Sequence, residues 1–125
     1  MTMDVAPDQD EEAKAASPPM PGRPTPESST GRPIMAALHL LSRRWVLRVI
    51  WELRHGPVGF RDMQARCDRM SPNTLSNRLA ELRSAGIADR DASGDWELTP
   101  LGRRLRPALT ELQRWSDEWA DSLNP

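Results

Sequence analysis

Residues 71–85, SPNTLSNRLAELRSA, have the pattern of a short, capped amphipathic helix. Ser71 is a favourable N-cap because its hydroxyl can accept a hydrogen bond from an unpaired N–H of the first turn. Pro72 follows at the first helical position, where the missing N–H carries no penalty. The spacing therefore predicts a helix that begins after Ser71, stops at Gly86 and packs on a core through one apolar stripe, Leu75, Leu79 and Leu82.

The opposite face of this helix is polar and carries Asn73, Thr74, Asn77, Arg78 and Glu81. In the major groove of DNA, Asn can pair through two hydrogen bonds with adenine, and Arg with guanine. Two asparagines one turn apart beside an arginine, near the start of a helix, therefore indicate a DNA recognition helix. The alternative interpretation is an ordinary solvated helix face, although Glu and Lys are more common on such a face.

The segments on both sides predict a mainly α-helical domain with one small β-hairpin. Ser42 is expected to cap the second helix, and Gly56 to end it. Apolar periodicity and turn residues place helices over 34–41, 43–55 and 61–67, an extended piece over 58–60, hairpin strands over 87–91 and 96–99, and a last helix after Thr99 and Pro100. This order of elements is that of a winged helix-turn-helix.

The composition divides the chain into two parts. Residues 1–33 hold seven of the twelve prolines and several acidic residues, but almost no large apolar side chains. Such a segment cannot bury enough surface to offset its ordering entropy, so we expect residues 1–33 to be a disordered, acidic, Pro-rich tail. Residues 34–125 are expected to form one winged helix-turn-helix domain with a C-terminal dimerisation helix.

Several classes of protein are not expected from this composition. The chain has no apolar run near 18 residues, which predicts no transmembrane helix and no membrane partner. The acidic, Pro-rich start is unlike a signal peptide, and a single cysteine, Cys67, allows no intramolecular disulfide. These features predict a cytoplasmic protein. Cys67 itself is interpreted as a small core residue on the apolar face of its helix.

Positive charge is concentrated in the middle of the chain. The net charge of the whole chain is −1, but residues 43–83 hold nine arginines and four acidic residues. This excess predicts a face that binds a polyanion, with solvated arginines as the alternative. Candidate phosphate contacts, which would position the protein without choosing a sequence, are Arg43, Arg44, Arg61 and Arg90, and the hairpin turn adds Ser93 and Gly94.

The last helix carries a long apolar ridge made of Leu105, Leu109, Leu112, Trp115, Trp119 and Leu123. The ridge can pack on the first helix of the same chain, or it can form a two-fold dimer in which the first and last helices of both subunits interleave. We favour the dimer because aromatic residues are enriched at interface cores. The predicted interface residues are Leu38, Leu41, Leu109, Leu112, Trp115 and Trp119.

Three ordered blocks of residues 33–120 resemble the HxlR-type winged-helix transcription regulators, which are relatives of the MarR group. The first block is ALHLLSRRW (37–45) with IWEL (50–53) and Gly56. The second is FRDM (60–63) followed by SPNTLSNRLAEL (71–82), and the third runs from Gly86-Ile87 to WELTPLG (96–102). The resemblance implies a winged helix-turn-helix fold, DNA binding through residues 71–83, and a homodimer.

Three positions depart from the pattern of that family. Some members sense oxidants or electrophiles through a Cys-Pro pair before the first helix, but Arg32-Pro33 stands here. The glycine pair before Trp45 is replaced by Ser42-Arg43, which adds a cation at a helix start. The hairpin turn, 91–95, is shorter than in many relatives. A thiol-sensing role is therefore not implied for this chain.

No catalytic arrangement, metal-ligand cluster or cofactor-binding loop is found in the sequence, so we expect neither an enzyme nor a metal or cofactor site. The sequence predicts a dimeric, sequence-specific DNA-binding regulator that binds an inverted repeat in double-stranded DNA as a repressor, with activation as the open alternative. A small apolar or aromatic effector is a further expected partner. The alternative is a winged-helix module that binds another protein and has little specific affinity for DNA.

Overall fold

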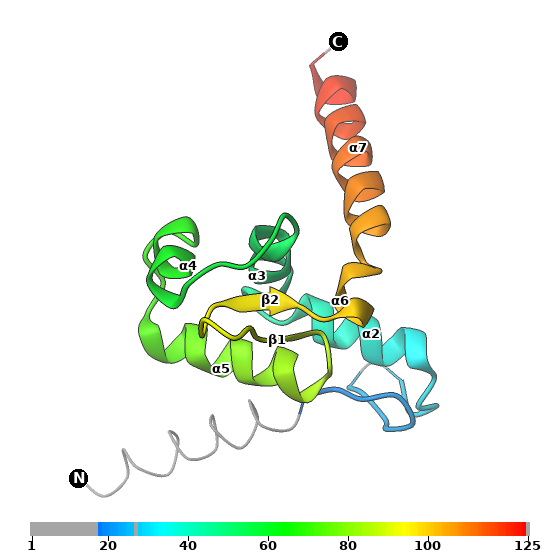
Figure 1. Ribbon diagram of the computed structural model, residues 1–125. Helices are drawn as coiled ribbons and strands as arrows, with labels where there is room; N and C mark the ends of the chain where they lie inside the picture. Colours follow the sequence, from blue (N-terminus) through cyan, green and yellow to red (C-terminus); the bar gives the residue numbers. More distant parts are fainter. Residues whose placement is uncertain (1–17, 27, 125) are drawn as a thin grey trace, which may run out of the picture.

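The computed structural model describes residues 18–26 and 28–124, and its helices form a body from which the last helix projects (Figure 1). Within these described ranges, five helices and a two-stranded antiparallel sheet precede that last helix. The elements are α2 (Pro33–Ser42), α3 (Val46–Leu53), α4 (Phe60–Arg66), α5 (Pro72–Ser84), β1 (Ala88–Arg90), β2 (Trp96–Leu98), α6 (Pro100–Arg103) and α7 (Arg106–Leu123). The predicted fold, mainly α-helical with one small β-hairpin in winged helix-turn-helix order, is confirmed. None of the described helices is long and apolar enough to span a bilayer.

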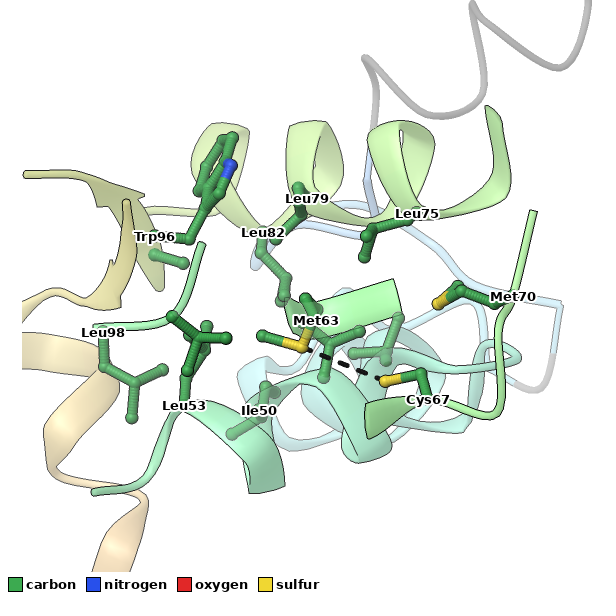
Figure 2. Packing of buried hydrophobic residues seen from close by; sticks show 14 of the residues in the cluster. Ile50, Leu53, Met63, Cys67, Met70, Leu75, Leu79, Leu82, Trp96 and Leu98 are labelled. Carbon is green, nitrogen blue, oxygen red and sulfur yellow. Dashed lines mark hydrogen bonds between the residues drawn. The ribbon is translucent and has the colours of Figure 1, made fainter. Parts of the chain in front are cut away.

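The core lies between α3, α4 and α5, and Figure 2 shows their side chains meeting there. Helix α3 buries four residues at the spacing of one helix face, Val46, Val49, Ile50 and Leu53. The predicted leucine stripe of α5 is buried against them, together with Met63 of α4. Each such side chain removed from water contributes about 1.5–3 kcal/mol. The stripe therefore fixes the orientation of α5 and turns its polar face outward.

The hairpin forms a wing that is attached to the core at its base. Asp89 pairs with Glu97 at the centre of the ladder, and Arg90 lies opposite Trp96. The backbone of Val58 exchanges two hydrogen bonds with Trp96, at 2.8 and 2.9 Å, so the predicted extended piece before α4 adds a third short edge. Because Trp96 is buried in the core, the start of the wing is held rigidly beside α3.

The start of the second helix differs from the prediction. Helix α3 begins at Val46 instead of Arg43, and it ends at Leu53 instead of His55. Ser42 does not cap it, because Ser42 ends α2 and its hydroxyl donates to the carbonyl of His39 at 2.9 Å. The chain reverses between the two helices through Trp45, whose φ of 76° lies in the left-handed region. Local patterns do not predict that conformation, since bulky residues rarely adopt it.

The last predicted helix is divided into two. Thr99 caps only α6, where its Oγ1 accepts a hydrogen bond from the N–H of Gly102 at 3.0 Å. Helix α7 then begins at Arg106. Pro107 explains the break because it has no N–H to donate to the carbonyl of Arg103, and its ring disfavours a continuous helix there.

The described part of the segment before α2, which belongs to the tail predicted over 1–33, contains local turns. Gly22 donates its N–H to the carbonyl of Gly31 at 2.8 Å, and Thr25 and Ser28 form an isolated backbone bridge. Pro18 is buried. Residues 1–17 and 27 of the predicted tail lie outside the described residues.

Candidate nucleic-acid interface

Helix α5 begins with the predicted cap. The hydroxyl of Ser71 accepts a hydrogen bond from the N–H of Thr74 at 3.1 Å and donates one to the Thr74 hydroxyl, also at 3.1 Å. Pro72 occupies the first turn. The cap and the buried leucine stripe together fix both the start of α5 and the direction of its polar face.

The two asparagines of α5 are available to a partner. Asn73 is exposed and Asn77 is half-buried, one helical turn further along. Within the described part of the chain, neither side-chain amide makes a hydrogen bond. Thr74 differs, because its hydroxyl is already engaged with Ser71. The two amides each offer a donor and an acceptor to base edges, whereas the Thr74 hydroxyl has only its own O–H left to donate.

Arg78, a predicted base contact, and Arg43, a candidate phosphate contact, are both engaged in pairs within the domain. The Nε of Arg78 donates to the carbonyl of Arg44 at 2.7 Å, and its Nη1 pairs with Oε2 of Glu81 at 2.5 Å. The Nε of Arg43 forms an ion pair with the other carboxylate oxygen of Glu81. Glu81, predicted on the polar face of the helix, is fully buried. Both arginines are therefore engaged by a carboxylate inside the domain.

Three other candidate cations are exposed and form no ion pair among the described residues. Arg44 lies in the turn before α3, with its guanidinium 5.8 Å from the centre of the Trp45 ring. Arg61 is in the first turn of α4. Arg90 lies at the end of β1 over the ring of Trp96, at 5.2 Å. The exposed turn residues Ser93 and Gly94 follow Arg90, and Gly94 has the positive φ of 86° that this turn requires.

A cavity of about 370 Å³ joins the α2–α3 turn to the start of α5. It brings together four of the predicted site residues, and its lining is Arg44, Trp45, Met70, Ser71, Thr74 and Arg78. Guanidinium and hydroxyl groups beside a helix N-terminus provide the positive charge and donors that an anionic oxygen requires. The sequence did not indicate Trp45 and Met70 as part of this site. Arg61 and the wing tip are not among its lining residues.

Known proteins match both the sequence and the fold of this chain. Residues 40–124 match the family described as HxlR-like helix-turn-helix. The HTH-type transcriptional regulator YvaP of Bacillus subtilis is 34% identical over 91 residues, which cover 68% of this chain and 84% of YvaP. The chain belongs to the HxlR-like helix-turn-helix family. Its predicted resemblance to that family is therefore confirmed.

Solved structures extend the match of this HxlR-like chain to the fold. The quinone-bound YodB of B. subtilis superposes with a TM-score of 0.63 at 30% identity, covering 68% of this chain and 96% of that structure. A regulator of the MarR family from Enterococcus faecalis V583 also gives a TM-score of 0.63, at 26% identity, and covers 71% and 86%. The HxlR-like chain is accordingly a DNA-binding transcription regulator and not an enzyme.

The projecting helix α7 of this HxlR-like regulator exposes an apolar surface, unlike the polar face of α5. On α7, the rings of Trp115 and Trp119 stack with centroids 5.6 Å apart, and the two residues are 56% and 55% exposed. Leu112 of α7 and Leu38 of α2 are also exposed. They border an apolar groove of about 280 Å³ between α2, α3 and α7, whose lining includes Leu38, Leu41, Leu47, Leu105, Leu109 and Leu112.

Two of the predicted interface residues, Leu109 and Leu41, pack within their own subunit. Leu109 is only 7% exposed and belongs to the core cluster of its own chain, and Leu41 packs partly against the same cluster. The turn of α7 nearest the domain thus uses its apolar face to attach the helix. The remaining predicted interface residues, further along α7 and on α2, are not covered by described residues of the chain.

Cys67 is enclosed by the core, as predicted. Its Sγ lies 3.9 Å from the Sδ of Met63, and the residue has no exposed surface (Figure 2). Burial raises the pKa of the thiol above its usual range. The sulfur is therefore held as a neutral, inaccessible thiol, which is unlike a reactive sensor cysteine.

Proposed function

We propose that this regulator is a homodimer that reads an inverted repeat, with the α5 helix of each subunit in a major groove, and that it represses transcription by occupying a promoter. The observation that carries the proposal is the outward face of α5, where two free amides stand beside a polar cavity on a helix held rigidly by its leucines. Asn side chains favour adenine in the major groove, by about 1–3 kcal/mol for each good pair.

Phosphate contacts in this proposal come from the exposed cations around α5. Arg44 lines the cavity beside the N-terminus of α5, Arg61 is in the first turn of the preceding helix, and Arg90 is at the wing. Contacts of this kind orient the protein on the duplex without choosing a sequence. The wing tip at Ser93 and Gly94 is proposed to approach the backbone beside the same groove.

The second subunit is proposed to cover the exposed surface of α7. Two stacked tryptophans and a leucine exposed on one helix, next to an apolar groove, match the composition of a protein interface core. Two-fold symmetry then requires half-sites whose centres lie about one helical turn apart, roughly 10 bp. Such a regulator acts where the DNA is, which in a bacterium is the cytoplasm.

A small apolar or aromatic effector is proposed to bind a second cavity, of about 350 Å³. Its apolar lining comes from the segment before α2, from α2 itself, from the turn between α5 and β1 and from α6, and includes Met20, Ala36, Leu40, Ile87 and Leu101. Ala85, the residue that follows α5, also lines it, so an occupant would lie next to the C-terminal end of the recognition helix. The solved structure of quinone-bound YodB shows that one relative binds a quinone.

The effector proposal is tested by thermal unfolding of the chain with 1-naphthoate and with a small quinone. Binding is expected to raise Tm in the native chain but not in an Ala37→Trp variant, whose larger side chain fills the cavity. An equal rise in both proteins would place the compound elsewhere.

The DNA proposal is tested by fluorescence anisotropy on the intergenic DNA upstream of the gene and on a scrambled duplex. We expect a preference of about 10³-fold or more that persists near physiological salt. Equal, weak binding that disappears with salt would reflect phosphate attraction alone and would favour a protein-interaction module.

A further inference from the structure

Glu81 is the one fully buried charged residue among those that the structure describes. Its two carboxylate oxygens are shared between arginines from different elements. Oε2 pairs with Arg78, one turn earlier in α5, and Oε1 pairs with Arg43 in the turn between α2 and α3. The side chains of Arg43 and Arg78 are only 22% and 16% exposed. The cluster therefore joins the recognition helix to a turn that is distant in sequence.

The same cluster holds the backbone of that turn. The Nε of Arg78 donates to the carbonyl of Arg44, and Trp45 follows in a left-handed conformation that bulky residues rarely adopt. Arg44 is thereby placed at the cavity beside the start of α5, with its own side chain exposed and without an ion pair among the described residues. Glu81 thus pairs directly with Arg43 and Arg78, and it helps to place Arg44 because Arg78 holds the Arg44 carbonyl.

We infer that Glu81 is a positioning residue of the DNA interface, which withholds Arg43 and Arg78 from DNA and leaves Arg44 as the cation of the cavity that reaches a phosphate. Base choice then depends on the neutral amides of α5, and Arg78 is not a base reader. This inference rests on the proposed function and assigns roles within the same site. In this assignment, Arg44 attracts DNA of any sequence, and the α5 amides choose the sequence.

Loss of the carboxylate would release the two arginines. A guanidinium left in a buried site without an anion is strongly disfavoured. Both arginines are near the surface and have long flexible stems, so they can move their charged ends into solvent. Arg78 already lines the cavity next to Ser71 and Thr74, so its released charge would face the bound duplex. Added cations strengthen binding to every sequence, and the preference for the correct sequence falls.

The test compares Glu81→Gln with Glu52→Gln in the full chain. Glu52 is a matched control because its replacement changes the net charge equally, while its own partner, Arg48 at 3.0 Å, lies on α3 beside Arg66 and Asp68, outside the predicted contacts. Affinities for the upstream duplex and a scrambled duplex are measured over a range of salt concentrations. Circular dichroism and thermal unfolding report whether each variant is folded.

For Glu81→Gln we expect about tenfold tighter binding to the scrambled duplex at low salt and about a tenfold smaller preference for the upstream duplex. The slope of log K against log salt should steepen by about 0.9 for each released arginine that reaches a phosphate. Glu52→Gln should change each quantity by less than about twofold. An unchanged slope and preference in folded Glu81→Gln would overturn the inference.

A triple variant, Arg43→Gln/Arg78→Gln/Glu81→Gln, keeps the inference testable if the single variant does not fold, because it leaves no unpaired charge in the buried site. Its salt slope should equal that of the native chain. A slope shallower by about 1.8 would mean that both arginines already contact phosphates in the native complex, which contradicts the inference. If the native chain itself shows no preference for the upstream duplex, the proposed function fails instead.

Discussion

Helices α5 and α7 each present one face that the described chain does not cover, and the two faces differ in chemistry. The uncovered face of α5 carries free amides beside a polar cavity, whereas that of α7 carries stacked tryptophans and a leucine. Amides match the edges of bases, and an apolar surface matches another protein. The comparison indicates that the composition of an uncovered face identifies the class of partner.

The two helices also differ in how they are attached. Helix α5 buries a whole stripe of leucines and is further tied to the α2–α3 turn through Glu81. Helix α7 has a single buried residue, Leu109, and projects from the body (Figure 1). Helix α5 is therefore fixed within one subunit, while most of the apolar surface of α7 is left exposed by the described chain.

The largest expected effect concerns this difference in attachment. Leu79→Ala should lower the free energy of unfolding by about 2–5 kcal/mol, because it leaves a cavity in the core. Leu112→Ala is the matched control, since the same atoms are removed from an exposed site on α7. Urea unfolding at a concentration where the chain is monomeric checks both. Equal losses would show that α7 is as firmly packed within the subunit as α5.

The next largest effect concerns the apolar face of α7. Trp115→Ala and Trp119→Ala should each weaken self-association by about 2 kcal/mol, or roughly 30-fold, if they are interface hot spots. Sedimentation equilibrium measures the change. Glu111→Gln on the same helix alters only an exposed pair with Arg114 and should have little effect. Unaltered association in both tryptophan variants would remove α7 from the interface.

The polar face of α5 gives the third prediction. Asn73→Ala and Asn77→Ala should each reduce the preference for the upstream duplex by about 1–3 kcal/mol, because each removes a group that can pair with a base. Binding to the scrambled duplex should stay the same. Ser84→Ala, at the exposed end of α5, is the control. If the preference survives both asparagine changes, another element selects the sequence.

A smaller effect is expected at the start of the same helix. Ser71→Ala removes the hydroxyl that accepts the N–H of Thr74, which should destabilise the domain by about 1 kcal/mol. Thermal unfolding at constant protein concentration measures the loss, and Ser71→Asp, which retains a capping oxygen, should recover most of it. An unchanged Tm in the alanine variant would mean that packing alone holds the first turn.

The smallest effect is expected at Cys67. Its raised pKa and burial should make the native thiol nearly inert to a thiol reagent at neutral pH, with reaction appearing only on unfolding. A raised folded pKa stabilises the fold below the pKa of the unfolded thiol, and that contribution is lost as the pH rises above it. Cys67→Ala should therefore flatten the alkaline decline in stability. Rapid labelling of the native chain would contradict this account.

The elements with strong local signals were predictable from the sequence. The Ser-Pro cap and leucine stripe of α5 placed the helix correctly, and the glycine-containing turn placed the hairpin. Pro107 was also a visible signal for the break before α7, since proline interrupts a helix, but the apolar ridge that runs through it suggested one continuous helix.

Features that depend on contacts distant in sequence were not predictable in the same way. The spacing of Arg78 and Glu81 permits a pair within one helix, but the burial of Glu81 requires Arg43 from another element. Periodicity, which considers one helix at a time, cannot include Arg43 and therefore placed Glu81 on the polar face. The left-handed conformation of Trp45 likewise opposes its local preference, and its side chain packs partly against the core cluster.

Hydroxyl-radical footprinting of the full chain on the upstream duplex tests the central claim most directly, because it reports both faces at once. If α5 binds DNA and α7 joins two subunits, two symmetric protected blocks should appear, with centres about one helical turn apart. In the double variant Trp115→Ala/Trp119→Ala, each half-site should be bound independently, so the protection of both blocks should become weak. A single protected block without symmetry, unchanged in that variant, would contradict the assignment of the two helices.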